Sequence, residues 1–294
     1  MSYVINSAAQ GTPEWLAARA GLISGSCAHL ARKVGMLTEQ QAAYVAAIKS
    51  GFDERAACLT SGYKKAPTAN AVSNALAGMP VGEWGEESKK YAFRVAVERI
   101  TGQPLDEGFA GNFFSKRGKR LEEEARMIYE LRHDCLVTEV GLIHTEDRRF
   151  GVSADGWVDD EDGIEIKAFL DPAKLMPMLL NNDFSSIRDQ VLMNLWLSGR
   201  RRWHQILYVP ALEIIGRDLT VCTVDRRADG VEDEIAQLEQ DLIALDALVE
   251  SYRARLLEGA TPADLGIPAE VPAEQPVTVA ARPVAPDAIA SMTF

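Results

Sequence analysis

The chain has 294 residues, of which 47 % are hydrophobic and 25 % are charged, as in an ordinary globular protein. Its formal charge of −12 argues against a protein that coats nucleic acid non-specifically, but it is compatible with an enzyme that encloses its substrate. No stretch approaches the roughly 18 apolar residues of a membrane span, and no secretion signal is visible. Four cysteines without a Cys-x-x-Cys pair argue against a zinc or iron–sulfur site and favour a cytoplasm.

Two helices are predicted near the N-terminus. Thr12 followed by Pro13 is typical of a helix start, and Ser24-Gly25-Ser26 caps a second helix that begins near Cys27. Serine hydroxyls and the free N–H groups of a helix start, with Arg19 nearby, can bind an anion such as a phosphate. The alternative interpretation is ordinary capping beside a surface arginine.

Three short helices are predicted within residues 37–79. Thr38 caps the first, Asp53 caps the second, which ends at Gly62, and the third covers 69–76. Their alanine-rich faces bury little, so a helical lid is one interpretation of this segment.

An amphipathic helix is predicted over 86–101, followed by a basic approach over 112–120 and a second helix that opens at Gly118 and runs to about Leu131. Glu122 lies one turn into the second helix. Residues 137–144 are predicted to form a strand.

The segment 150–169 is predicted to be a β-hairpin. One strand covers 151–158 and carries Asp155, an acidic turn covers 159–163, and the second strand places Glu165 and Lys167 on one face. Carboxylates are hard oxygen ligands suited to Mg²⁺, and a lysine can hold a water beside the metal. The alternative is a surface hairpin with solvated charges.

The remaining chain continues the alternation of helices and strands. We expect a short apolar helix within 171–182, a helix over 187–198 with Gln190 near its start, strands over 203–209 and 219–224, and a long helix over 230–257. From residue 260 on, Pro and Ala dominate, which predicts a mobile tail. The order of elements favours an α/β (α+β) fold, in which a central mixed sheet is flanked by helices.

A known family shares this combination of motifs. Gly118-x-x-x-Glu122, Asp155 and Glu165-x-Lys167 together resemble the PD-(D/E)XK nuclease core, with Ser153-Ala154 in place of the Pro. Gln190 on a following helix resembles the lambda exonuclease and YqaJ recombinase branch. The upstream pattern, Trp15-x-x-x-Arg19-x-Gly21-x-Ile23-Ser24-x-Ser26, is similar to the N-terminal motif of that branch.

The resemblance implies a role for each of these residues. It assigns catalysis to Glu122, Asp155, Glu165, Lys167 and Gln190. It assigns Mg²⁺, which Mn²⁺ could replace, to Asp155, Glu165, the carbonyl of Ile166 and Glu122. It assigns the phosphate at a 5′ end of DNA to Arg19, Ser24, Ser26 and Ser153.

The resemblance also implies an activity and partners. It implies a 5′→3′ exonuclease on linear double-stranded DNA that leaves 3′ single strands for recombination by strand annealing. The implied partners are a single-strand annealing protein and further copies of the chain in a ring, in the cytoplasm of a bacterium that carries the phage or prophage. The implied domains are a nuclease core (1–36 and 80–228), the insertion (37–79), a C-terminal helix (229–258) and a flexible tail (259–294).

The insertion resembles a second family, because its pattern is similar to the helix-turn-helix unit of phage terminase small subunits. That resemblance implies contact with DNA through Lys64, Lys65, Thr68 and Asn70. Two alternatives remain for the whole chain: an endonuclease on the same core, and a DNA-binding packaging or adaptor protein without catalysis.

Overall fold

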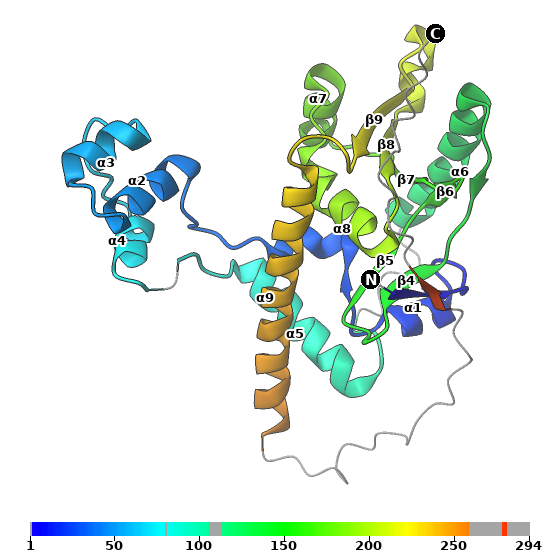
Figure 1. Cartoon of the computed structure of the whole chain (residues 1–294). Helices are drawn as coiled ribbons and strands as arrows, with labels where there is room; N and C mark the ends of the chain where they lie inside the picture. Colours follow the sequence, from blue (N-terminus) through cyan, green and yellow to red (C-terminus); the bar gives the residue numbers. More distant parts are fainter. Residues whose placement is uncertain (1, 80, 106–112, 259–277, 281–294) are drawn as a thin grey trace, which may run out of the picture. The chain divides into compact units, whose positions relative to one another are not determined.

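The computed structural model describes residues 2–79, 81–105, 113–258 and 278–280 (Figure 1). The chain divides into two compact units, of which the first comprises Met1–His29 and Ala92–Phe294 and the second Leu30–Tyr91. The second unit contains the expected insertion, 37–79, and extends beyond it at both ends. The expected tail, 259–294, lies outside the described residues apart from 278–280.

The first unit is built on two mixed five-stranded sheets, which confirms the α/β class. The first sheet has the order β10 (Thr278–Ala280), β1 (Ser2–Asn6), β4 (Leu142–Thr145), β5 (Phe150–Ser153) and β2 (Ile23–Ser24). The second has the order β3 (Val137–Thr138), β6 (Gly156–Val158), β7 (Asp162–Lys167), β8 (Arg202–Tyr208) and β9 (Leu219–Asp225). The pairs β2–β5 and β7–β8 are parallel. The sequence did not predict β1 or β2.

The chain crosses from one sheet to the other at Asp155. The strand predicted over 151–158 is divided there, because β5 ends at Ser153 and β6 begins at Gly156. The last pair of the β6–β7 ladder is Gly156 with Ile164. Two residues further along β7, the N–H of Ile166 donates to Asp155 Oδ2 at 2.6 Å. The carboxylate therefore takes the place of the next strand partner, and this ends the ladder.

Two further predictions for this region need correction. The strand predicted over 137–144 is also divided, into β3 and β4, which belong to different sheets. The turn of the hairpin is shorter than 159–163, because β7 already begins at Asp162. Asp159 adopts the left-handed conformation (φ 52°), and its side chain accepts from the N–H groups of Glu161 and Asp162. Gly163 lies inside β7, where the ring of Trp203 leaves no space for a side chain.

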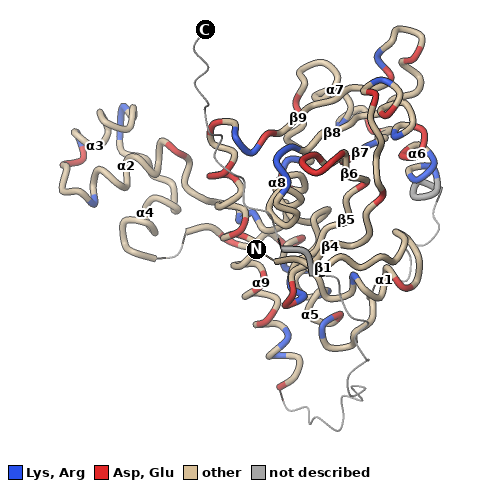
Figure 2. The backbone as a smooth tube through the Cα atoms, turned by 45° about the vertical axis from the view of Figure 1, so that its right-hand side comes forward, with Lys and Arg blue, Asp and Glu red and all other residues tan. Residues whose placement is uncertain are grey.

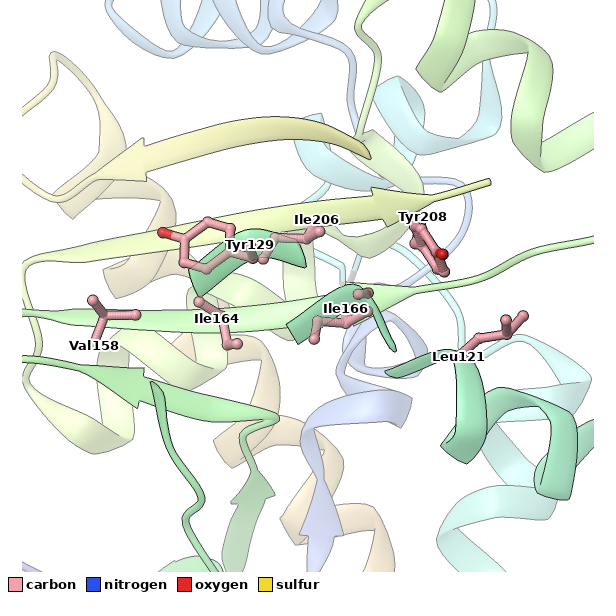
Figure 3. Close-up of a cluster of buried hydrophobic side chains, with 8 residues drawn as sticks. Leu121, Tyr129, Val158, Ile164, Ile166, Ile206 and Tyr208 are labelled. Atoms are coloured by element: carbon pink, nitrogen blue, oxygen red, sulfur yellow. The ribbon is translucent and has the colours of Figure 1, made fainter. Parts of the chain in front are cut away.

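Helix α6 (Phe113–His133) packs on one face of the second sheet. Figure 3 shows Leu121 and Tyr129 of this helix beside Ile164 and Ile166 of β7. The helix begins five residues before the expected start at Gly118, so the predicted basic approach is largely helical. Glycine is a poor helix former, but the five helical residues before Gly118 and the fifteen after it are enough to carry it inside the helix.

Other helices cover the remaining faces of the first unit. They are α1 (Pro13–Arg19), α5 (Glu86–Thr101, from Ala92 on), α7 (Pro172–Asn181), α8 (Arg188–Ser198) and α9 (Val231–Leu257), with 3-10 turns over Gly25–Ala31, Ser185–Ile187 and Pro210–Ile215. Thr12 caps α1 as predicted, by accepting from the N–H of Trp15. The helix expected from Cys27 is instead the 3-10 turn that begins at Gly25. In the described part of the chain, no helix is long and apolar enough to cross a membrane.

The second unit contains the three predicted helices. They are α2 (Glu39–Lys49), α3 (Glu54–Ser61) and α4 (Asn70–Leu76). As predicted, Thr38 caps α2, Asp53 caps α3, and α3 ends at Gly62. The structure adds that Thr38 forms a capping box with Gln41 and that Gly62 is left-handed. A small core of its own holds this unit: Tyr44, Val45, Ala47, Ala57, Cys58, Val72 and Ala75.

Candidate active site

The structure brings the hairpin residues Asp155, Glu165 and Lys167 together. Lys167 Nζ lies 2.7 Å from Glu165 Oε1. Asp155 is 8 % exposed and Glu165 is 2 % exposed, whereas the side chain of Lys167 is 24 % exposed. The low exposed fractions of Asp155 and Glu165 exclude the surface-hairpin alternative, because solvated carboxylates would not be buried. Lys167 is the member of the group that solvent or a substrate can reach.

Helix α8 holds Glu165 from the other side. Gln190 Nε2 donates to Glu165 Oε1 at 2.5 Å, and Asn194 Nδ2 lies 3.3 Å from Glu165 Oε2. The family resemblance assigned Gln190 to catalysis, and in the structure its amide binds the carboxylate of Glu165. Asn194 was not predicted at all. The signal was available, since residues four apart share one face of a helix and Asn194 follows Gln190 by four.

Glu122 of α6 belongs electrostatically to the same group. Burial raises the pKa of its carboxyl, Lys167 opposes this, and Glu165 adds to it. Burial also raises the pKa of Asp155 well above its usual value, and the carboxylates of Glu165 and Glu122 raise it further. Burial lowers the pKa of Lys167, but Glu165 and Asp155 outweigh it, so the net direction is upward and the amine is charged.

The donors of this group suit a divalent metal ion. Among the described residues, no three Asp, Glu, His or Cys side chains are already gathered as a finished metal-ligand set. However, three buried or half-buried carboxylates face a single lysine; burial raises the pKa of Glu122 and of Asp155, and repulsion by the neighbouring carboxylates adds to this. A hard cation would relieve that repulsion, and oxygen ligands of this kind are the ones that Mg²⁺ prefers. We refer to Glu122, Asp155, Glu165 and Lys167 as the carboxylate cluster.

The predicted anion-binding residues also meet. Arg19 Nη2 donates to Ser24 Oγ at 3.0 Å and lies 3.4 Å from Ser26 Oγ. The guanidinium also lies over the ring of Trp15, 5.4 Å from its centroid. Ser24 is buried, whereas Ser26 is exposed and Arg19 is half-buried. We refer to Arg19, Ser24 and Ser26 as the anion cluster; a phosphate would replace the serine hydroxyls as the partner of the arginine.

Two contacts link residues next to the anion cluster with residues next to the carboxylate cluster. The Nε1–H of Trp15 donates to Ser153 Oγ at 3.0 Å, two residues before Asp155. Gly25 lies against the body of Gln190: a Cβ at Gly25 would stand 3.8 Å from Gln190 Cγ and 2.9 Å from Val152 Cγ1. The segments that carry the two clusters therefore contact each other, and at Gly25 the side chain of Val152 leaves no room for a Cβ.

The residues predicted to contact DNA in the second unit are placed at its surface. Lys64, Lys65 and Thr68 lie in the segment before α4, and Asn70 is the first residue of that helix. All four are exposed. Their contact with DNA stays a prediction.

Comparisons with known proteins agree with this fold. The model of the YqaJ-like viral recombinase domain matches residues 14–201. An alkaline exonuclease (LHK-Exo) from Laribacter hongkongensis has a similar structure, with 20 % identity and a TM-score of 0.57 over 84 % of this chain and 97 % of that one. The structure of LHK-Exo in complex with dAMP is also similar, with 22 % identity and a TM-score of 0.55 over the same shares of the two chains.

Among proteins with curated descriptions, none matches the sequence significantly. The family model, in contrast, covers more than half of the chain, and its range includes both clusters. The chain belongs to the YqaJ-like viral recombinase domain family.

Proposed function

We propose that this protein is a Mg²⁺-dependent deoxyribonuclease that digests linear double-stranded DNA from a 5′-phosphorylated end. The observation that carries this proposal is the joining of the anion cluster to the carboxylate cluster through Gly25, Gln190 and the Trp15–Ser153 hydrogen bond. A terminal phosphate bound to Arg19 would lie next to the carboxylates, so the phosphodiester offered for hydrolysis would be one close to the end. That geometry favours an exonuclease over an endonuclease.

Each residue of the site has a role in this reaction. Asp155, Glu165 and the carbonyl of Ile166, with Glu122, would hold Mg²⁺, or Mn²⁺ in its place. Bound there, the ion would polarise the phosphodiester and favour ionisation of a water. Lys167 orients the attacking water and stabilises the developing negative charge. Gln190 and Asn194 fix the orientation of Glu165, and Arg19, Ser24, Ser26 and Ser153 bind the terminal phosphate.

The relatives support the same reaction class. LHK-Exo is called an alkaline exonuclease, and it has been crystallised with dAMP, a nucleotide that carries one phosphate. The family is described as viral recombinases, which supports 5′→3′ digestion that leaves 3′ single strands for annealing. We infer that the protein works with a single-strand annealing protein, as a ring of identical subunits, in the cytoplasm of a bacterial host.

The proposal is tested by digesting a linear duplex labelled at either the 5′ or the 3′ end, with Mg²⁺ and with chelator. Wild type is compared with Lys167→Ala. We expect early release of the 5′ label by wild type only, and only with metal. Nicking of closed circles without digestion of linear duplex would make the protein an endonuclease. Binding without any cleavage would indicate a packaging or adaptor protein.

End recognition is tested separately with Arg19→Ala and Arg19→Lys on duplexes that carry a 5′-phosphate or a 5′-hydroxyl. We expect wild type to prefer the phosphate, Arg19→Ala to lose this preference, and Arg19→Lys to keep part of it, because lysine retains the charge without the paired donors. Equal preference in wild type and Arg19→Ala would remove Arg19 from end recognition.

A further inference from the structure

Helix α9 carries a buried carboxylate on its apolar stripe. The buried residues of the stripe are Val231, Ile235, Leu238, Leu242, Leu245, Asp246 and Val249. Asp246 is 4 % exposed. Burial of a lone carboxylate is strongly unfavourable, so a residue of this kind is retained only with charged partners close by.

Asp246 has two such partners, and they come from different parts of the fold. Its Oδ1 lies 2.7 Å from Arg99 Nη1, on α5, and its Oδ2 lies 3.2 Å from Arg149 Nη1, next to β5. Glu250, one turn further along α9, also contacts Arg99 at 2.8 Å. The two arginines are therefore held by α9.

Both arginines in turn hold the backbone between Arg19 and Ser24. Arg99 Nε donates to the carbonyl of Gly21 at 2.8 Å, and the carbonyl of Arg149 accepts from the N–H of Ile23 at 2.8 Å. Arg99 Nη2 also donates to the carbonyl of Arg149 at 3.3 Å.

The N–H group of Gly21 is bound by Glu98, the residue before Arg99 on α5. Glu98 Oε2 accepts from the N–H of Gly21 at 3.0 Å. Gly21 has φ +77°, and a Cβ there would stand 2.9 Å from Arg99 Cγ. Both the N–H and the carbonyl of Gly21 are therefore hydrogen-bonded. These two bonds fix the turn between Arg19 and Ser24.

We propose that Asp246 and Arg99 are positioning residues for the 5′-phosphate: through the backbone of 21–23 they fix the distance between Arg19 and the serines. This inference rests on the proposed function of the anion cluster and adds α9 to the end-binding site. Neither residue contacts the carboxylate cluster in the described contacts. Their loss should therefore weaken binding of the phosphorylated end and leave the chemical step unchanged.

The test compares Asp246→Asn, Arg99→Met and Arg99→Lys with wild type, by measuring kcat and KM on duplexes with a 5′-phosphate or a 5′-hydroxyl. We expect the KM for phosphorylated ends to rise about tenfold in Asp246→Asn and Arg99→Met, since one charged hydrogen-bond network is lost. The KM for hydroxyl ends and kcat should stay within about twofold. Arg99→Lys should recover part of the preference.

Asp218→Asn is the matched control. Asp218 is also buried (2 % exposed) and pairs with Arg132 at 2.7 and 2.9 Å, away from the anion cluster. We expect Asp218→Asn to lower Tm by about as much as Asp246→Asn. Unlike Asp246→Asn, it should not change the preference for phosphorylated ends. A preference that survives in Asp246→Asn, or one that falls equally in Asp218→Asn, would overturn the inference.

Hydrogen exchange of the peptide that covers 19–26 separates this inference from the proposed function. We expect faster exchange in Asp246→Asn than in Asp218→Asn. Wild type that does not distinguish the two kinds of end would refute end recognition itself, and the positioning role with it. Wild type that does distinguish them, with exchange and preference unchanged in Asp246→Asn, would refute only the role of Asp246.

Discussion

Trp15 and Ser153 form a 3.0 Å hydrogen bond between residues that are 138 positions apart in the sequence. The same indole ring lies under the guanidinium of Arg19. One side chain thus contacts both an expected phosphate ligand and the strand end that leads to Asp155.

Trp15→Phe separates these two contacts, because phenylalanine keeps an aromatic ring under Arg19 but cannot donate to Ser153. We expect a fall of about fivefold to tenfold in kcat/KM on phosphorylated ends, from the loss of one hydrogen bond. Ser153→Ala should cause a similar fall, and the double variant should be no worse than either single one. Additive effects in this double-mutant cycle would show that the bond is not what couples the residues.

Gly25→Ala introduces a methyl group where Val152 Cγ1 is 2.9 Å away. We expect a loss of stability of about 1–3 kcal/mol from overpacking and a loss of activity, because Gln190 lies on the same side. Val152→Ala should restore both in the double variant by making room. Urea unfolding and end-label digestion measure the two effects, and a double variant no better than Gly25→Ala would disprove the steric explanation.

Asn194→Leu removes the amide that donates to Glu165 Oε2 while roughly keeping the volume of the side chain. We expect kcat to fall about tenfold, as for one hydrogen bond to a charged group, with KM and the preference for phosphate unchanged. Ser198→Ala is the control, because in the described contacts Ser198 bonds only backbone groups, the carbonyl of Asn194 and the N–H of Arg200. If both variants lose activity equally, the effect comes from α8 as a whole.

Mg²⁺ should stabilise the folded protein, because it neutralises repelling carboxylates. We expect a gain of about 1.4 kcal/mol at a concentration ten times Kd, seen as a rise in Tm that chelator reverses. Asp155→Asn keeps an acceptor for the N–H of Ile166 but loses one charge. This variant should match or exceed the Tm of wild type without metal and should gain nothing from Mg²⁺. An equal gain in both proteins would place the ion elsewhere.

We predict that the stability of the protein depends on pH through His144, a residue that belongs to neither cluster. Burial lowers the pKa of its imidazole, Arg148 adds to this, and a hydrogen bond to the carbonyl of Thr145 opposes it. Below the unfolded pKa of about 6.5 the unfolded chain therefore binds a proton that the native state does not. Stability should fall as the pH drops below about 6.5, by at most about 1.4 kcal/mol per pH unit for this group.

His144→Gln is the comparison for that prediction. The fall between pH 7 and 5 should be shallower in the variant, as measured by urea unfolding at each pH. Parallel curves for the two proteins would exclude a contribution of His144.

Local signals in the sequence predicted most of the elements and the residues of both clusters. Caps at Thr12, Thr38 and Asp53 and the hydrophobic stripe of α9 depend on neighbours within a few positions, so they can be read directly. The division of the hairpin strand at Asp155 could not be read, because it depends on a side chain that replaces a strand partner eleven residues away. Asp246 was missed for the same reason: its partners come from distant parts of the chain.

The three arginines after α8 bear on how the protein approaches its substrate. Arg200 donates to the carbonyls of Asp159 and Asp162, Arg201 pairs with Glu161, and Arg202 pairs with Asp162. Figure 2 shows this basic run beside the acidic turn between β6 and β7. Two of the three guanidinium groups are therefore paired with carboxylates of the same chain, and the third is hydrogen-bonded to backbone carbonyls.

The consequence concerns ionic strength. When a protein neutralises a phosphate of duplex DNA, counterions are released. Each such phosphate makes the slope of log binding constant against log salt concentration steeper by about 0.9. We expect a chain with a net charge of −12, in which Arg201 and Arg202 are paired with its own carboxylates, to gain little from such release. We therefore expect its attraction to the sides of a duplex to be weak, so that under the proposed function the directed contacts at a strand end would determine where it binds.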